Sequence, residues 1–438
     1  MSVGALTSRQ YRFKARPWDL VRTPSVCAGC AVGCNIEVHS RTESVLRLVS
    51  RANPTIDDGW LCDRGRFATM PSPHAGRPSR PMVRQDGALR PATWDEACVK
   101  AAELLGNGGG VLASAGLSNE AFWLLQRLAP RVPAALWPPV GQAWPVEGKI
   151  ENLARCKAIV LVGLDVWNDL PVLALWIRRA VQAGARLVVL GPRNGLVRST
   201  AHWLNGDPLA LLESLVSALA STSAPAGSPE IAAAAAALRG QQPVAVLAHP
   251  ALIAGDGRGL LERLVAALGA SGVTGLVGAP LLGANGCGAM LLAPNVGRNE
   301  ANRVLASSVV MTLGDEAWAD LQIGSFARIV VATSQPVPED PRIDVVLPMA
   351  HAYERQGTLI NLEGRLQHQS GGASPPPQSR ADWAILAGLA RELGVAPAPT
   401  NLDVLRSLIA DEHASIASAL LDEGLFSHVG SAARGGSL

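Results

Sequence analysis

The chain has 438 residues, of which 48% are hydrophobic, so it can bury more than one core and is expected to form two or three domains. Its 38 basic and 36 acidic residues leave a formal net charge of +2, which offers no electrostatic footprint for nucleic acid. No stretch approaches the roughly 20 uninterrupted apolar residues of a membrane helix, and residues 1–22 lack the apolar segment of a secretory signal. A nucleic-acid-binding protein and an integral membrane protein are therefore not expected.

Four of the seven cysteines stand near the start of the chain in the pattern Cys-x2-Cys-x3-Cys-x27-Cys: Cys27, Cys30, Cys34 and Cys62. Three thiolates on one loop and a fourth from a later turn suit a [4Fe–4S] cluster, which takes four Cys ligands. Structural zinc also takes four thiolates, usually as two close pairs, and free thiols are the remaining alternative. The uneven spacing favours the cluster, and cysteines used for metal favour a reducing, cytoplasmic compartment.

Residues near the four cysteines suggest how such a cluster is accommodated. Gly29 and Gly33 allow the backbone to approach a ligand closely. Arg64 follows Cys62 by two residues and is expected to place a cation beside an anionic cluster and favour its reduced state, although a plain surface charge is the alternative. Residues 36–40 and 45–49 alternate like a β-hairpin and fill the gap between Cys34 and Cys62.

From Trp94 onward, helical patterns alternate with short apolar runs, which indicates βαβ units and a parallel sheet covered on both faces. Helices are expected over residues 94–105, 120–128, 172–183, 230–239, 259–268 and 383–393. Strands are expected over residues 111–115, 158–163, 186–190, 243–247, 308–313, 328–332 and 344–348.

These patterns predict an α/β protein in which a small N-terminal domain of short strands precedes Rossmann-like α/β domains. The expected division is a [4Fe–4S] domain at 1–80, a first α/β domain at 81–220, an Ala/Pro-rich linker at 221–242, a second α/β domain at 243–425 and a flexible tail at 426–438.

Other motifs point to no further chemistry. Cys98, Cys156 and Cys287 are interpreted as packed, inert thiols. Residues 283–288 are rich in glycine but lack the flanking strand and helix of a nucleotide-binding loop. The eight histidines show no metal-ligand spacing, and no nucleophile motif is present, so no catalytic residue is predicted.

Four stretches give the chain a resemblance to a known family: residues 3–18, residues 59–67 around the last cysteine of the quartet, residues 158–193 and residues 344–367. In these stretches the chain resembles the molybdopterin oxidoreductase superfamily and, within it, the iron–sulfur G-subunit family of bacterial NADH-quinone oxidoreductase (respiratory complex I). The resemblance implies an extra [4Fe–4S] site on the four cysteines and α/β domains of the molybdopterin type.

The sequence also departs from the pattern of that superfamily. The ferredoxin-like region of the G-subunit family would precede Met1, so its further clusters are not assigned to this chain. Catalytic members hold molybdenum or tungsten between two pterins, usually with a Cys, selenocysteine, Ser or Asp ligand, and residues 121–155 contain none of these. The usual lysine after the last cluster cysteine is replaced by Arg64. The α/β domains are therefore expected to be degenerate, without molybdopterin.

The expected function is that of an iron–sulfur electron-transfer and scaffold subunit, not itself catalytic, of an NADH dehydrogenase (quinone) of the complex I kind. The resemblance implies other complex I-like subunits as partners, including a ferredoxin-like or NADH-oxidising one. It also implies a cytoplasmic location, peripheral on the inner face of the membrane through those partners. Two alternatives stay open: a catalytic molybdopterin subunit of formate dehydrogenase or nitrate reductase type, and an assembly scaffold without redox turnover.

Overall fold

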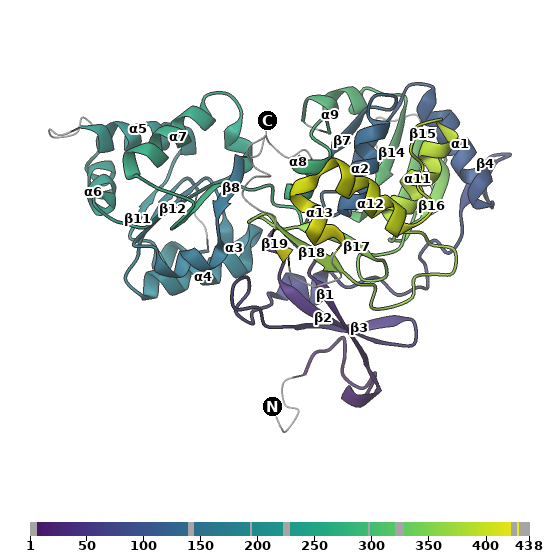
Figure 1. The fold of residues 1–438 in the computed structure, drawn as a ribbon, viewed down its shortest axis with the longest axis horizontal. Coiled ribbons are helices and arrows are strands. Elements are labelled where there is room, and N and C mark those ends of the chain that lie inside the picture. The colour runs from purple at the N-terminus through teal and green to yellow at the C-terminus, as the bar shows by residue number, and fades with distance from the viewer. Residues whose placement is uncertain are drawn as a thin grey trace.

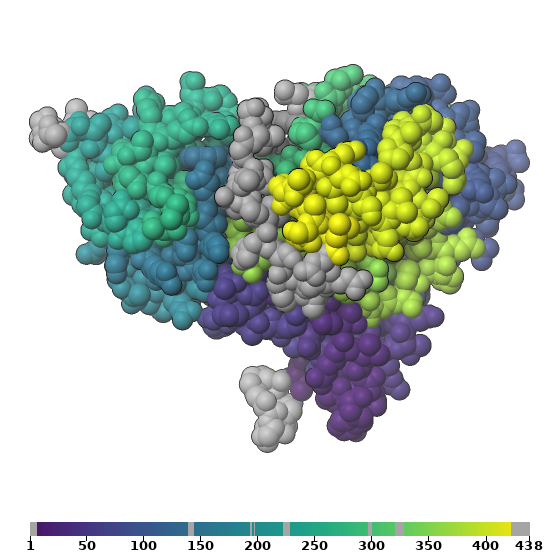
Figure 2. All heavy atoms as spheres, in the orientation of Figure 1, coloured from purple at the N-terminus to yellow at the C-terminus, as the bar shows by residue number. Residues whose placement is uncertain are grey.

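The computed structural model describes residues 7–138, 144–192, 195–221, 228–296, 298–319, 328–421 and 427–428. Figure 1 shows three bodies: N-terminal strands at the bottom, a teal body on the left, and a body on the right that mixes blue, green and yellow segments. The space-filling view places the purple N-terminal body beneath the other two (Figure 2). The mixed colours of the right-hand body mean that distant parts of the sequence build it together.

The N-terminal body is a three-stranded antiparallel sheet in the order β1-β2-β3, formed by β1 (Val21–Val26), β2 (Asn35–Arg41) and β3 (Ser44–Ser50). The predicted hairpin is confirmed, because β2 and β3 pair antiparallel with Ile36 opposite Ser50. Ile36, Val38 and Leu48 are buried and form a small core against the cysteine loop.

A seven-stranded sheet has the order β5-β4-β16-β15-β14-β6-β7. Strands β6, β7, β14, β15 and β16 run parallel, whereas β4 and β5 add an antiparallel edge. The strands are β4 (Met82–Gln85), β5 (Ala88–Pro91), β6 (Gly109–Ala113), β7 (Ala134–Leu136), β14 (Val309–Leu313), β15 (Arg328–Thr333) and β16 (Ile343–Pro348).

Helices cover both faces of this sheet, which explains its continuous apolar strands. One face shares a hydrophobic core with α1 (Trp94–Gly106), α2 (Asn119–Leu128), α8 (Gly286–Leu292), α11 (Asp382–Glu392), α12 (Leu402–Glu412) and α13 (Ala414–Leu421). The other face packs against α9 (Arg298–Leu305) and α10 (Asp315–Ala319). Local chemistry starts the first helix, since Thr93 and Glu96 form a reciprocal capping box.

A six-stranded sheet builds the teal body in the order β11-β10-β9-β12-β13-β8. Its strands are β8 (Trp144–Gly148), β9 (Ala158–Val162), β10 (Arg186–Leu190), β11 (His202–Leu204), β12 (Val244–Ala248) and β13 (Leu276–Ala279). One face is covered by α4 (Pro171–Gln182), and the other by α5 (Pro208–Ala220), α6 (Pro229–Leu238) and α7 (Gly257–Leu268). The short helix α3 (Val166–Asp169) precedes α4.

The sheets do not follow the division expected at 81–220 and 243–425. Strand β9 pairs with β12 across the supposed linker, and β6 pairs with β14, which follows it by an entire domain. Helix α6 lies within the supposed linker, and its buried Ile231 and Leu238 join the core of the six-stranded sheet. The six-stranded domain is thus inserted between β7 and β14 of a discontinuous domain. The prediction grouped the strands by their order along the chain. Strand pairing depends instead on which strands bury their apolar side chains together, and this does not follow chain order.

A second hairpin, β17 (Gly357–Ile360) and β18 (Arg365–Gln369), lies between the N-terminal body and the α/β bodies. Of the expected tail at 426–438, residues 427–428 form β19, which pairs with β18, and the remainder falls outside the described residues. In the part of the chain that the structure describes, no helix is both long and apolar enough to cross a membrane. The expected α/β class with a small N-terminal strand domain is confirmed.

Candidate functional site

The first three cysteines of the quartet occupy the connection from β1 to β2. Cys27 directly follows β1 and Cys34 directly precedes β2, and the backbone N–H of Cys27 donates to the carbonyl of Cys34 at 2.9 Å. This bond closes the loop at its base, so the pairing of two strands brings its ends together. Cys27, Cys30 and Cys34 are all buried thiols.

Cys62 reaches the loop by way of a turn that Asp57 organises. The buried carboxylate of Asp57 accepts hydrogen bonds from the backbone N–H groups of Asn35 (2.8 Å), Asn53 (3.0 Å) and Gly59 (2.8 Å). One bond ties the turn to β2, and the other two shape the turn itself. Sequence reasoning missed Asp57, because an isolated Asp among turn residues gives no sign of its partners.

Gly65 lies close to two of the four thiols, those of Cys27 and Cys62. A Cβ placed on Gly65 would lie 2.9 Å from Cys27 Sγ and 3.6 Å from Cys62 Sγ. The backbone N–H of Gly65 also donates to Cys62 Sγ at 3.3 Å. This glycine lies in a short π-helix, Arg64–Ala68, that begins directly after the turn bearing Cys62. Cys27 and Cys62 therefore both lie close to this glycine.

Burial makes these thiols hard to ionise without a metal. Burial and the neighbouring sulfurs raise the pKa of Cys27 to about 12, and the same two causes raise that of Cys34 well above its usual range. Since thiolate is the form that binds metal, loading must displace protons from these groups. Among the described residues, no group of three or more His, Cys, Asp and Glu side chains is close enough to hold one metal ion. A cube attaches each thiolate to a different iron, so its ligands need not converge on a single ion.

Arg64 lies beside Cys30 and also connects the cysteine loop to the six-stranded domain. Its guanidinium donates to the carbonyls of Asn168 (3.1 Å) and Asp169 (2.6 Å) at the end of α3. Burial raises the pKa of Cys30, and the charge and hydrogen bond of Arg64 oppose that rise. The cation therefore favours the thiolate form of this ligand.

The β17–β18 hairpin holds the cysteine loop by donating hydrogen bonds to backbone carbonyls of the loop. Asn361 Nδ2 donates to Val32 O (3.1 Å), Gln367 Nε2 donates to Gly33 O (3.0 Å), and Leu362 N donates to Ala31 O (2.7 Å). These contacts give a physical role to the later part of the stretch 344–367.

The two loop glycines serve different ends. A Cβ on Gly29 would lie 3.4 Å from Cys27 Sγ, consistent with close approach to the ligands. Gly33 has a φ of 69°, and its Cβ would lie 2.4 Å from Gln367 Oε1. A glycine is therefore required at position 33 because the backbone is left-handed there and because β18 packs closely against it. The sequence analysis had instead given Gly33 the role of letting the backbone approach the cluster.

Tyr353 is the functional residue that sequence reasoning missed most completely. Its hydroxyl accepts a hydrogen bond from Ala28 N at 3.1 Å, although the two residues are 325 positions apart. It also contacts Thr69 Oγ1 at 2.9 Å, and it opposes the rise in the pKa of Cys27. A lone Tyr next to Glu354 carries no local signal of such a contact.

A cavity of about 190 Å³ adjoins the cysteine loop on the side of the seven-stranded sheet. It lies at the carboxyl ends of β6 and β14, where the strand order reverses, which is where open α/β sheets bind ligands. Its walls include Ala28 and Thr69 from the N-terminal body, and Ser114, Asp315, Gln335 and His351 from the α/β body.

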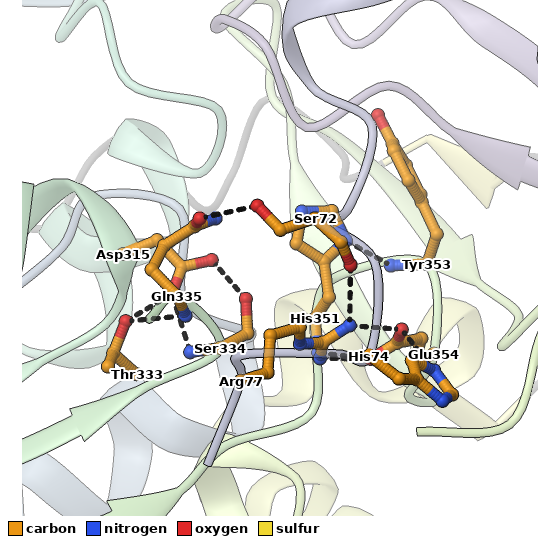
Figure 3. Close-up of polar contacts among 10 residues, drawn as sticks. All are labelled: Ser72, His74, Arg77, Asp315, Thr333, Ser334, Gln335, His351, Tyr353 and Glu354. Atoms are coloured by element: carbon orange, nitrogen blue, oxygen red, sulfur yellow. Dashed lines mark hydrogen bonds and ion pairs between the residues drawn. The ribbon is translucent and has the colours of Figure 1, made fainter. Parts of the chain in front are cut away.

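The polar groups of the cavity are tightly bonded to one another (Figure 3). Asp315 accepts hydrogen bonds from Thr333 Oγ1 (2.7 Å) and from Ser334 N (2.7 Å) and Oγ (2.5 Å). Burial opposes ionisation of Asp315, but the nearby His351 and these donors hold its pKa below the usual value. Burial lowers the pKa of His351, which favours its neutral form.

Beside the cavity, a buried ion pair links the N-terminal body to the α/β body (Figure 3). The guanidinium of Arg77 meets both carboxylate oxygens of Glu354 at 2.7 Å. The same carboxylate accepts from His351 N at 3.0 Å and lies 3.6 Å from His74 Nε2. This bidentate geometry fixes the segment that carries Tyr353.

Four cysteines beneath a doubly wound α/β body define an iron–sulfur protein of the oxidoreductase type. Residues 20–70 match the family model described as the NADH-ubiquinone oxidoreductase NDSU1/NuoG-like 4Fe-4S domain. Residues 77–224 and 298–392 match the molybdopterin oxidoreductase model, together more than half of the chain. The chain belongs to the molybdopterin oxidoreductase family and contains a [4Fe–4S] domain.

The curated relatives are subunits of NADH-quinone or NADH-ubiquinone oxidoreductase. The chain is 26% identical to the G subunit of NADH-quinone oxidoreductase from Streptomyces coelicolor, over 90% of this chain and 56% of the relative. It is 31% identical to the G 2 subunit of the same enzyme from Rhizobium meliloti, over 44% of this chain and 25% of the relative. It is 26% identical to the mitochondrial NADH-ubiquinone oxidoreductase 78 kDa subunit of Neurospora crassa, over 90% and 54%. The Streptomyces and Neurospora relatives match most of this chain, but the chain spans only about half of their length.

Solved structures share the fold at low identity. Acetylene hydratase from Pelobacter acetylenicus superposes with a TM-score of 0.58 and 14% identity, covering 85% of this chain and 69% of that one. A chain of the formyltransferase/hydrolase complex FhcABCD from Methylorubrum extorquens superposes with a TM-score of 0.53 and 18% identity, covering 72% and 98%. At these identities the likeness concerns the fold alone.

Proposed function

We propose that the chain holds one [4Fe–4S] cluster on Cys27, Cys30, Cys34 and Cys62 and passes single electrons through it. The observation that supports this proposal is the approach of Cys27 and Cys62 to Gly65, together with the mutual charge effects of the four thiols, inside a segment that matches a 4Fe-4S domain. The donor set fits the group, because four thiolates are the ligands that this cluster takes. Each electron comes from one partner protein and passes on to another.

Two groups stabilise negative charge at the sulfurs. They are the cation of Arg64 and the hydrogen bond from Gly65 N to Cys62. Hydrogen bonds to sulfur and nearby charge set the potential of an iron–sulfur site. Arg64 therefore favours the reduced state, and through Asn168 and Asp169 it also fixes the six-stranded domain relative to the cysteines.

We propose further that the chain has no pterin active site. The cavity beside the cysteine loop has about 190 Å³, below the roughly 300–1,000 Å³ typical of pockets for small-molecule ligands. Its polar groups are already bonded within the protein, as the contacts of Asp315 illustrate. Residues 121–155 also lack the Cys, Ser and Asp that serve as metal ligands in catalytic members of the superfamily.

The assembly in which the cluster operates is proposed to be of the complex I kind. The complex I relatives, matched over 90% of this chain in two cases, support other NADH-quinone oxidoreductase subunits as partners, including a ferredoxin-like or NADH-oxidising one. Such partners would hold the chain at the cytoplasmic face of the membrane. NADH oxidation and quinone reduction then take place on other subunits.

Anaerobic loading of the full chain with iron and sulfide tests the proposal. We expect four iron and four sulfide per chain, a low-temperature EPR signal on reduction, and no molybdenum, tungsten or pterin in protein purified from its host. Cys62→Ser should lose iron, whereas the matched control Cys287→Ser, also at a half-buried thiol, should keep it. One zinc per chain would overturn the cluster, and bound pterin would restore the catalytic alternative. A cluster that never changes oxidation state would favour the scaffold alternative.

A further inference from the structure

We infer that the Tyr353 hydroxyl is a hydrogen-bond donor shared between Thr69 Oγ1 and Cys27 Sγ, and that it raises the reduction potential of a cluster on Cys27 by turning toward the sulfur. The inference rests on the proposed function, since it concerns the tuning of that cluster. Tyr353 acts through a ligand and is therefore a positioning residue.

Counting hydrogens shows why the donor must be shared. The Tyr353 oxygen already accepts from Ala28 N, and it lies 2.9 Å from Thr69 Oγ1. Thr69 Oγ1 in turn lies 2.9 Å from the carbonyl of Gly65, which can only accept. Each hydroxyl carries a single hydrogen, so the chain of contacts has two consistent arrangements.

In the first arrangement, Thr69 donates to Gly65 O and Tyr353 donates to Thr69, which leaves Cys27 Sγ without this donor. In the second, Thr69 donates to Tyr353, and Tyr353 donates to Cys27 Sγ. In the second arrangement, the carbonyl of Gly65 loses the hydrogen bond that Thr69 donates in the first. The two arrangements differ only by the rotation of two O–H bonds, so neither requires the backbone to move.

The surroundings keep Tyr353 in this role. Its side chain is fully buried, so water does not replace a missing hydrogen-bond partner, and an unmade bond there is costly. Its backbone is also held, because Tyr353 N donates to His351 Nδ1 at 3.3 Å.

Reduction favours the second arrangement for an electrostatic reason. One added electron increases the negative charge shared by the sulfurs, and a hydrogen bond to a charged acceptor is about twice as strong as a neutral one. The Tyr353 hydrogen turns toward Cys27 and no proton leaves the protein. The reduced state is therefore stabilised relative to the oxidised state, which raises the potential.

Two substitutions should shift the potential in opposite directions. Tyr353→Phe removes the donor, so the cluster becomes harder to reduce and its potential falls. Thr69→Val removes the competing acceptor while keeping the methyl group near Gly29, so Tyr353 bonds to Cys27 without first breaking another bond, and the potential rises. Tyr11→Phe is the matched control: Tyr11 is the only other tyrosine, its hydroxyl donates to Ala15 O, and its loss should leave the potential unchanged.

The measurement is an equilibrium titration with dithionite, followed by low-temperature EPR, on the full chain loaded with four iron. In deuterated buffer, electron–nuclear double resonance should detect an exchangeable deuteron near the reduced wild-type cluster that Tyr353→Phe lacks, beyond those of Arg64 and Gly65 N that both proteins share. An unchanged potential in Tyr353→Phe overturns the inference while leaving the proposed function intact. If that variant fails to load, Thr69→Val decides, and an unchanged or lowered potential overturns the inference. A wild-type chain that takes up no iron overturns both.

Discussion

Replacing Glu354 by Gln removes the negative charge from the buried ion pair that joins the N-terminal body to the α/β body. The side chains of Arg77 and Glu354 are 0% and 1% exposed, and two N–O contacts of 2.7 Å connect them. Gln keeps the size of Glu and can still accept from His351 N, so the main loss is electrostatic. Arg77 would then be a buried cation without a counter-charge.

Breaking a buried pair by neutralising one partner typically costs about 3–5 kcal/mol of unfolding free energy. For a cooperative unit of 150–250 residues, each kcal/mol lowers Tm by about 2–4 °C, which gives a decrease of roughly 6–20 °C for Glu354→Gln. The control is Glu262→Gln, at the exposed Arg258–Glu262 pair, whose side chains are 47% and 52% exposed. Exposed pairs contribute about 0–1 kcal/mol, so this control should shift Tm by no more than about 4 °C.

Differential scanning calorimetry of the full chain measures both variants under identical conditions. Adding Arg77→Met to Glu354→Gln should recover part of the lost stability, because the uncompensated cation is then gone. The reasoning would be refuted if Glu354→Gln melted within the range of the Glu262→Gln control. It would also be refuted if the double variant were less stable than the single one.

Three further outcomes follow from the site. Gly65→Ala should load little iron, because its Cβ would lie 2.9 Å from Cys27 Sγ, whereas Gly259→Ala, with no atom within 4 Å, should load normally; iron analysis checks both. Wild-type stability should fall as pH drops below about 6.5, because unfolded His351 takes up a proton that burial denies to the folded state. His351→Asn should remove that contribution, at most about 1.4 kcal/mol per pH unit, in urea melts from pH 7 to 5. Asp57→Asn should slow iron loading without removing a ligand, because its carboxylate shapes the turn before Cys62; normal loading rates would contradict this role.

Local pattern was sufficient for most secondary structure. The helices predicted near residues 94–105 and 172–183 are α1 and α4, and the strands predicted near 158–163 and 186–190 are β9 and β10, paired in parallel. Such elements follow from hydrophobic periodicity and capping, which act over a few residues. Their assembly into sheets did not follow, because β6 pairs with β14 over a distance that no local pattern encodes.

The sequence by itself predicted the donor set and determined the class of fold. Cys27, Cys30 and Cys34 stand close together in the sequence because they share one short loop, and so their pattern is visible in one dimension. Apolar runs likewise report burial, because a strand covered on both faces needs apolar residues at every position.

Only the tertiary structure decided what surrounds the four cysteines. Tyr353, Gln367 and Asn361 come from a segment far along the chain, and they contact the cysteine loop because β17 and β18 pack against the N-terminal body. Asp57 and Gly65 are near Cys62 in sequence, yet their roles depend on where their neighbours lie in space. Hydrogen bonds and close approach act over a few ångströms, without regard to separation along the chain, so the immediate environment of the site becomes visible only once the chain has folded.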